Sequence, residues 1–281
     1  ARGHVPRTAG DGETLIHLYE EYGLELFAHL RGMYAFALWD SRAHRLLLAV
    51  DHIGMKPLYL YERGGMLCFA SEVKAFLADP AMPRALNVHA LDAYLGFGYM
   101  IGPETLFEGV RRLPPGHALV VENGTQTLHR FWSFGAAQGT AAASDNSDDT
   151  AIIGQARALL ADAVRIHLRS DVPLGLFLSG GIDSAAVLAL MAQEAGGRIR
   201  TYTIGYDMPV TDNELEQARR IAAHFETQHH ERVISADDWW TGFERYVYHH
   251  DEPNANPSAV SLLLLSEMTA RHVKVVLTGL G

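Results

Sequence analysis

The residues best suited to chemistry form a single loop, residues 179–184, with the sequence SGGIDS. Its members are Ser179, Gly180, Gly181, Ile182, Asp183 and Ser184. The two glycines let the backbone approach a phosphate closely, and the N–H groups that open the following helix, together with the helix dipole, favour negative charge. The serine hydroxyls supply further donors. This arrangement is typical of a loop that binds the phosphates of a nucleotide.

One acidic residue of the loop, Asp183, narrows the chemistry further. A carboxylate and a phosphate repel each other unless a cation lies between them, and Mg²⁺ on a pyrophosphate group is the obvious cation. The loop has neither a Gly-Lys-Ser/Thr ending nor Gly-x-Gly-x-x-Gly spacing, so it is not a Walker A or dinucleotide-binding loop. In a purely structural interpretation, Asp183 and Ser184 cap a helix and the glycines form a turn. We favour an ATP–Mg²⁺ site because strand, double glycine, Asp-Ser and helix occur together.

Charge and hydropathy exclude several classes of function. The 281 residues include 33 acidic and 23 basic side chains, for a formal net charge of −10, and no Lys/Arg run exceeds two residues. Nucleic acid is therefore not an expected partner, because proteins that bind it usually show a basic face. The longest purely aliphatic run, residues 262–265, is far shorter than the roughly 20 apolar residues of a membrane-spanning helix, so no membrane partner is expected.

The chain contains one cysteine, Cys68. A single thiol excludes an intrachain disulfide and a multi-cysteine metal site, and it suits a reducing compartment. No apolar stretch typical of a signal peptide opens the chain, so we expect a cytoplasmic location. The absence of an initial Met, and an end directly after the apolar run 273–277, favour an internal piece of a longer protein.

A change of composition divides the chain. Residues 134–150 are rich in Gly, Ala, Ser and Asp without an apolar period, which predicts a linker between an N-terminal domain, residues 1–133, and a C-terminal domain, residues 151–281. In the first domain, helices are expected at residues 14–30 and 88–95, and strands at residues 33–39, 45–50, 58–61, 66–69, 118–121 and 126–132. Many adjacent strands with few helices predict an antiparallel sheet packed against helices.

In the second domain the expected helices and strands follow one another in a different order. Helices are expected at residues 152–168, 185–195, 214–224, 237–249 and 259–269, and strands at residues 174–178, 199–204, 231–234 and 274–277. This alternation predicts a parallel sheet covered by helices. Ligands bind such sheets at the carboxyl ends of the strands, and residues 179–184 follow the first of these strands.

The loop and its surroundings resemble the asparagine synthetase (glutamine-hydrolysing) family, and the resemblance covers nearly the whole chain. In that family the motif SGGxDS holds the pyrophosphate of ATP and its Asp binds Mg²⁺, which implies that role for Asp183. The resemblance also implies that Phe177 and Ile204 hold the adenosine and that Thr278 and Gly279 close over the nucleotide. The C-terminal half is thus similar to a partial α/β adenine-nucleotide α-hydrolase-like (ATP-pyrophosphatase) synthetase domain.

The N-terminal half resembles the family's type 2 glutamine amidotransferase, an α+β N-terminal-nucleophile-hydrolase-like glutaminase domain, again in part. Five blocks follow the family order: residues 8–13 (TAGDGE), 30–36 (LRGMYAF), 51–59 (DHIGMKPLY), 70–74 (ASEVK) and 113–117 (LPPGH). In the first block, the resemblance implies that Asp11 binds the α-amino group of glutamine.

The sequence departs from the family in two places. The family's glutaminase nucleophile is an N-terminal cysteine whose own α-amine is the base. This chain begins at Ala1 and Cys68 is internal, so we do not expect these residues alone to hydrolyse glutamine. The second departure is Leu280, which replaces a Glu that the family ties to acyl-adenylate formation. Either a different base acts on another carboxylate, or adenylation proceeds through positioning and metal electrostatics.

The leading hypothesis is an ATP-dependent amidotransferase, a carbon–nitrogen ligase that uses glutamine, aspartate or a related carboxylate, ATP and Mg²⁺. It would make asparagine, glutamate, AMP and pyrophosphate through an acyl-adenylate. A second hypothesis is an ATP-dependent cyclase similar to β-lactam synthetases or lasso-peptide cyclases. A third is a non-catalytic nucleotide-binding scaffold, and a homodimer is a further possibility.

The remaining polar clusters have plainer interpretations. The histidine pairs at residues 229–230 and 249–250 are expected to be solvated or to cap helices rather than to bind zinc, because adjacent side chains point apart. Asp251 and Glu252 either contact substrate or metal at the open end of the parallel sheet, or simply begin a loop. Residues 111–112, Arg-Arg, are interpreted as a solvated turn.

Overall fold

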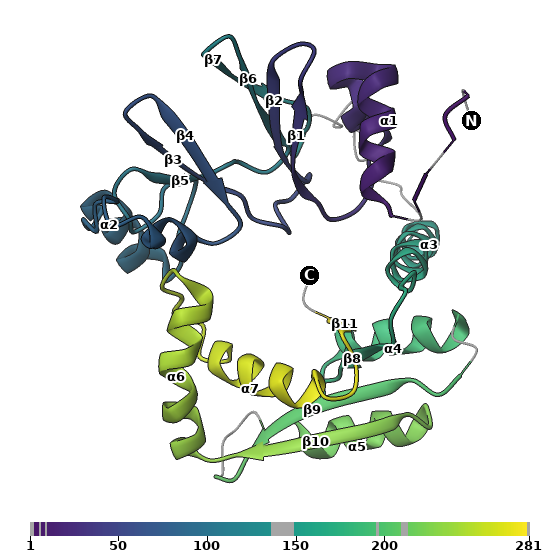
Figure 1. Cartoon of the computed structure of the whole chain (residues 1–281). Helices are drawn as coiled ribbons and strands as arrows, with labels where there is room; N and C mark the ends of the chain where they lie inside the picture. The colour runs from purple at the N-terminus through teal and green to yellow at the C-terminus, as the bar shows by residue number, and fades with distance from the viewer. Residues whose placement is uncertain are drawn as a thin grey trace. The chain divides into compact units, whose positions relative to one another are not determined.

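The computed structural model describes residues 3–5, 7–8, 10–135, 149–194, 197–208 and 213–279. The chain divides into two compact units (Figure 1). Unit 1 comprises Ala1–Thr140 and Asp251–Asn254, and unit 2 comprises Ala141–His250 and Ala255–Gly281. Most of the predicted linker, residues 136–148, lies outside the described residues, and its last two residues begin a helix.

Unit 1 contains two antiparallel sheets. The larger has the order β1-β2-β6-β7, with β1 at Ala35–Asp40, β2 at Arg45–Val50, β6 at His117–Glu122 and β7 at Thr125–Arg130. The smaller has the order β4-β3-β5, with β4 at Met66–Ala70, β3 at Tyr59–Arg63 and β5 at Val110–Arg112. The helical elements are α1 (Gly12–Tyr22), the 3-10 helices η1 (Gly23–His29) and η2 (Val73–Ala78), and α2 (Val88–Phe97).

Strand β2 shows how unit 1 is layered. Leu47 and Ala49 point to a cluster that includes the side chains of α1 and η1. Leu48 and Val50, on the opposite face, join a cluster with Leu58 and with Leu60 of β3. Because alternate residues of a strand face opposite sides, burial of both sets places β2 between the helices and the second sheet. The far side of the smaller sheet packs on η2.

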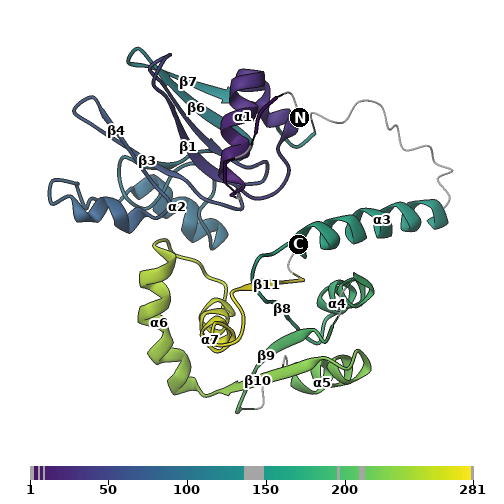
Figure 2. The same cartoon turned by 45° about the vertical axis from the view of Figure 1, so that its right-hand side comes forward.

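Unit 2 is a parallel sheet between helices. The order β10-β9-β8-β11 unites β10 (Gln228–Ile234), β9 (Arg200–Tyr206), β8 (Leu174–Phe177) and β11 (Val275–Leu277). The helices are α3 (Asp149–His167), α4 (Ile182–Glu194), α5 (Leu215–His224), α6 (Ala236–His250) and α7 (Ala259–Thr269). Figures 1 and 2 show α4 and α5 on one face of this sheet and α7 on the other. The chain therefore folds into three layers here, as the alternation of strands and helices predicted.

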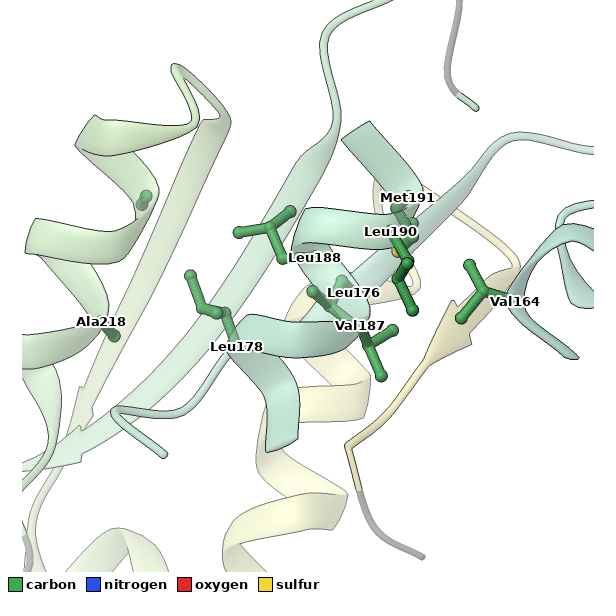
Figure 3. Packing of buried hydrophobic residues seen from close by; sticks show 9 residues of the cluster. Val164, Leu176, Leu178, Val187, Leu188, Leu190, Met191 and Ala218 are labelled. Carbon is green, nitrogen blue, oxygen red and sulfur yellow. The ribbon is translucent and has the colours of Figure 1, made fainter. Parts of the chain in front are cut away.

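The main core of unit 2 lies under α4. Leu176 and Leu178 extend from the β8 segment toward Val187, Leu188 and Met191 of this helix (Figure 3). Val164 of α3 and Ala218 of α5 belong to the same cluster. Because helix α4 follows directly on β8, this packing fixes the course of the loop between them. Among the described residues, no helix combines the length and apolar character that a membrane crossing requires.

The structure corrects three expectations for unit 1. Its strands form two sheets rather than one. The helix expected at residues 14–30 stops at Tyr22, because Gly23 has φ 55°, and the chain continues as a 3-10 helix. The short strand β5 was missed because only three residues form it. By contrast, β2 and α7 have the predicted bounds.

Candidate functional site

The loop at residues 179–184 is held by its own two serines. Ser179 Oγ lies 2.9 Å from Ser184 Oγ, and the Ser179 amide donates to Ser184 Oγ at 3.1 Å. The Gly181 amide donates to Ser179 Oγ, also at 3.1 Å. Ser184 is buried, with 3% of its surface exposed. In this structure the serine hydroxyls therefore shape the loop.

The loop also touches the start of α5 through Gly180. The Gly180 amide donates to the Glu214 carboxylate, with 3.1 Å between N and Oε2. A Cβ at Gly180 would lie 2.7 Å from Cβ of Gln217, so a larger residue would force α5 away. The Glu214 carboxylate thus accepts the hydrogen bond that the Gly180 amide could otherwise donate to a bound anion. The sequence interpretation missed Glu214, which it placed only as the first residue of a predicted helix.

Strand β11 brings residues 278–279, the second segment predicted to contact the nucleotide, beside the loop at residues 179–184. Thr278 and Gly279 follow β11, which pairs in parallel with β8. A Cβ at Gly279 would lie 2.4 Å from the backbone nitrogen of Ser184, so only glycine fits against the first turn of α4. Strands β9 and β10 are added on one side of β8, and β11 is added on its other side. Open α/β sheets bind ligands at such a topological switch point.

The two residues predicted to hold adenosine lie on neighbouring strands. Phe177 ends β8 and pairs with Tyr202 of β9, and Ile204 lies two residues further along β9. Both are half-buried and pack against the same cluster, which contains Tyr202 and Leu265. The structure therefore brings Phe177 and Ile204 together on the α7 face of the sheet.

The carboxylate of Asp183 is exposed at the loop. It lies in the first turn of α4, where the helix dipole stabilises negative charge. Within the described part of the chain, it makes no hydrogen bond or ion pair that would oppose cation binding. An exposed carboxylate at this position offers the oxygen ligands that Mg²⁺ prefers. Leu280, the other predicted site residue of this domain, lies outside the described residues.

In unit 1, Asp11 directly precedes α1 and is exposed. Its carbonyl accepts a hydrogen bond from the Thr14 amide at 3.0 Å, but its side chain does not cap the helix. The neighbouring Glu13 instead accepts bonds from the Arg7 amide and from the amide and hydroxyl of Thr8, all at 2.8 Å. These hydrogen bonds, with the Arg7 amide first, lower the pKa of Glu13 to about 2. The block 8–13 is thus folded around Glu13 and leaves Asp11 accessible.

A buried carboxylate organises a second block of unit 1. Asp51 has 1% of its surface exposed. Its side chain accepts bonds from four backbone amides, those of Tyr34, Ile53, Met55 and Lys56, at 3.0–3.2 Å. Within the same turn, Gly54 has φ 73° and a Cβ there would lie 2.9 Å from Cγ of Pro115. Residues 51–59 therefore form a structural turn, packed on the block that begins at residue 113.

Asp251 and Glu252 begin the loop between α6 and α7, which is the second of the two interpretations of these residues. Both residues cluster with unit 1. Lys74 Nζ lies 2.9 Å from Asp251 Oδ1, and Arg112 forms an ion pair with Glu252. The Tyr59 hydroxyl donates to Glu252 at 3.3 Å. Burial, followed by the charge of Glu252, raises the pKa of Tyr59 to about 12. Arg111 and Arg112 both lie in strand β5, so the interpretation of residues 111–112 as a turn was wrong, and Arg112 forms its ion pair with a buried carboxylate.

The histidine pair at residues 229–230 is also more buried than expected. His229 contacts the Thr201 hydroxyl at 2.9 Å and Glu231 at 3.1 Å. The His230 ring stacks on Tyr202 and His272 at centroid distances of 5.2 and 4.5 Å. Burial lowers the pKa of both imidazoles. These side chains are therefore packed into the sheet surface and do not meet in a metal site within the described residues.

Cys68 lies on β4, as expected. It is half-buried and packs against the cluster that contains Tyr61 and Phe76. Its partner in the register of the sheet is Tyr61. A thiol in this position has a packing role.

Comparison with known proteins agrees with the two-unit division. A family model described as asparagine synthase matches residues 155–281, and one described as glutamine amidotransferase domain matches residues 1–132. A putative asparagine synthetase (glutamine-hydrolyzing) of Mycobacterium tuberculosis is 36% identical over 99% of this chain and 43% of its own length. Asparagine synthetase (glutamine-hydrolyzing) 1 of Bacillus subtilis is 31% identical over 100% of this chain and 43% of its own length. The chain thus spans less than half the length of these relatives.

Among solved structures, a glutamine-dependent NAD+ synthetase from Acinetobacter baumannii, in complex with ADP, aligns with 96% of this chain and 65% of its own. The identity is 14% and the TM-score is 0.34. A similarity this low carries no argument about this chain.

Proposed function

We propose that the chain belongs to the asparagine synthetase (glutamine-hydrolysing) family and that the whole protein is an ATP-dependent amidotransferase that converts aspartate to asparagine; the two family models and the relatives support this. Glutamine would supply the nitrogen and leave as glutamate, and ATP would leave as AMP and pyrophosphate. The observation that carries this proposal is the loop at residues 179–184, which lies at the switch point of a parallel sheet and against Gly279.

The proposed ATP site uses the loop amides and the first turn of α4. The Gly180 amide would exchange the Glu214 carboxylate for a phosphate oxygen, and the Gly181 amide lies beside it. Mg²⁺, when bound, would offset the charge of the pyrophosphate group, and Asp183 would hold it. Phe177 and Ile204, half-buried on neighbouring strands, would contact the adenosine.

Thr278 and Gly279 would cover the nucleotide from β11. Because Gly279 already contacts the backbone of Ser184, a residue at this position lies within reach of a phosphate held by α4. Adenylation would then follow from positioning: a carboxylate oxygen of the acceptor attacks the α-phosphorus, and pyrophosphate leaves with the electron pair of the broken P–O bond. Ammonia would attack the acyl carbon and displace AMP. The Leu280 side chain carries no charge, so we assign Leu280 no role in this step.

Unit 1 would contribute the glutamine side of the reaction. We propose that Asp11, which is exposed, binds the α-amino group of glutamine. Cys68 has no free α-amine and packs in a sheet, so it is not the nucleophile, and these 281 residues alone would release no ammonia from glutamine. We further propose an N-terminal-nucleophile-hydrolase-like fold for unit 1, an adenine-nucleotide α-hydrolase-like fold for unit 2, and a cytoplasmic location, which the single thiol suits.

The decisive experiment compares two aspartates at equivalent helix positions. Asp183→Ala should weaken binding of ATP–Mg²⁺ at least tenfold and abolish pyrophosphate release by the full-length protein, because the metal loses its protein ligand. Asp237, an exposed aspartate in the first turn of α6, is the matched control, and Asp237→Ala should leave both measurements unchanged. If Asp183→Ala leaves ATP–Mg²⁺ affinity and turnover unaltered, the proposed site is wrong.

The acceptor can be identified with ammonia supplied in place of glutamine. Aspartate is expected to give AMP, pyrophosphate and asparagine in equal amounts, and the carboxylic acids related to it should give less. A substrate that cyclises without ammonia would instead support the cyclase hypothesis. Nucleotide binding without pyrophosphate release for any acid would support a non-catalytic scaffold.

A further inference from the structure

In unit 1, two imidazoles and a carboxylate lie close together at α1. These are His4, which precedes the helix, and His17 and Glu20, which belong to it. One ligand atom from each residue lies within 4.8 Å of the other two. Nδ1 of His4 is 3.7 Å and Nδ1 of His17 is 3.5 Å from the same oxygen, Oε2 of Glu20. Two ring nitrogens therefore face one carboxylate oxygen.

These separations suit a small tetrahedral cation. Zinc binds imidazole nitrogen and carboxylate oxygen at about 2.0–2.2 Å, so two ligands on a tetrahedron lie roughly 3.3–3.5 Å apart. The two distances to Glu20 need to shorten by no more than a few tenths of an ångström. Imidazole and carboxylate together select a divalent transition metal over Mg²⁺, which prefers oxygen ligands alone.

The outer nitrogens of both histidines face carboxylates. Nε2 of His4 lies 2.9 Å from Oε1 of Glu21, and Nε2 of His17 lies 3.4 Å from Oε1 of Glu13. The second of these contacts lacks hydrogen-bond geometry in this structure. A carboxylate on the far nitrogen fixes the ring tautomer so that the near nitrogen is free to bind a metal, as in carboxylate–histidine–zinc sites.

The local fold explains why these groups meet. Positions 13, 20 and 21 each lie three or four residues from position 17, so their side chains neighbour His17 on the surface of α1. Glu13 also holds the preceding segment through the amides of Arg7 and Thr8, at 2.8 Å each. This contact returns the chain toward the helix and brings the His4 ring to 4.5 Å from the His17 ring.

We propose that His4, His17 and Glu20 bind one divalent transition-metal ion, zinc being the best match, with water as the fourth ligand. The ion would fasten the segment before α1 to the helix. The alternative is a surface network of histidine–glutamate ion pairs without a metal. Only the metal site would bind zinc in a saturable way. The proposal does not depend on the proposed amidotransferase activity, because its residues lie in unit 1 and the ATP loop lies in unit 2.

The test is a zinc titration of the purified 281-residue chain against a chromophoric chelator, with Co²⁺ absorption as a second readout. One equivalent of Zn²⁺ should bind in competition with the chelator, and excess Mg²⁺ should not displace it. His17→Ala and Glu20→Gln should each weaken this binding at least tenfold. Glu21→Gln should weaken it about tenfold, as the loss of an outer partner typically does.

The chain has 15 histidines in all, His4 and His17 included, and matched controls separate this site from the others. His89 and Glu25 are exposed and lie on helical elements of the same unit, so His89→Ala and Glu25→Gln should bind zinc like the unaltered chain. Circular dichroism reports folding of each variant. If His17→Ala does not fold, Glu20→Gln decides, since that side chain is 52% exposed. No saturable zinc binding, or equal affinity in the site and control variants, would overturn the proposal.

Discussion

The buried ion pair between Arg112 and Glu252 offers a direct test of the forces within unit 1. The Glu252 side chain is 2% exposed and that of Arg112 is 33% exposed. The Tyr59 hydroxyl adds a hydrogen bond at 3.3 Å. Because the pKa of Tyr59 is raised to about 12, this hydroxyl remains a neutral donor throughout the neutral pH range. The perturbation is Arg112→Met, which keeps the apolar stem and removes the guanidinium.

The expected cost follows from what remains after the change. A buried carboxylate that loses its cation costs about 3–5 kcal/mol. We expect the lower end, about 3 kcal/mol, because a third of Arg112 reaches solvent and its Nε is buried without a hydrogen-bond partner in the native state. At about 2–4 °C per kcal/mol, the melting temperature of the unit should fall by about 6–12 °C.

Urea unfolding, followed by tryptophan fluorescence and by proteolysis, measures this change. The neighbouring residue is a matched control: Arg111 pairs with Glu62, and their side chains are 46% and 48% exposed. Arg111→Met should therefore cost less than about 1 kcal/mol. The double variant Arg112→Met/Glu252→Leu removes both charges and should recover most of the loss.

Two results would refute this reasoning. If Arg112→Met is no more destabilising than Arg111→Met, the burial of Glu252 has no energetic consequence in solution. If the double variant is as unstable as Arg112→Met alone, the cost arises from lost packing by the arginine stem and not from an isolated carboxylate.

Three further predictions concern other parts of the chain. Asp51→Asn should lower the free energy of unfolding by about 3 kcal/mol in urea, because an amide cannot accept from all four backbone donors. Glu214→Gln should tighten binding of Mg²⁺-free pyrophosphate, measured by calorimetry, because the carboxylate on the Gly180 amide competes with an anion; unchanged affinity would contradict this. Burial lowers the pKa of His230, so the unfolded chain takes up its proton first as pH falls. Stability of unit 2 should therefore decline below the unfolded value of 6.5, and His230→Phe should reduce this decline in melting scans from pH 8 to pH 5, while His89→Phe should not.

The parallel sheet and its loop were predictable because their signals are local. Strand β8, its double glycine and the start of α4 are contiguous, and contiguous strand–loop–helix patterns determine where amides point. The order of the strands is not local. Gly279 was expected near the nucleotide only through the family resemblance. The physical reason, a Cβ that would lie 2.4 Å from the Ser184 nitrogen, follows from β11 pairing beside β8.

Charged residues were interpreted less well, for a related reason. Arg112 and Glu252 are 140 positions apart, and nothing near either residue indicates a partner of opposite charge. An Arg-Arg pair is usually solvated, so burial of one member becomes apparent only when β5 is placed beside β3. Hydrophobic period predicts which face of an element is buried, but not which distant charge will meet that face.

The same limit applies to Glu214, and its consequence for function is the more important one. A helix that starts with glutamate has an ordinary capping interpretation, and the sequence contains no reason to aim that carboxylate at a phosphate loop. The parallel pairing of β8 with β9 and the packing of α5 against β9 accompany a distance of 3.1 Å between its Oε2 and the Gly180 amide. In the proposed site, a nucleotide would have to displace this internal anion before it gains that amide. Affinity for ATP would therefore depend on a competition within the loop as well as on the metal proposed at Asp183.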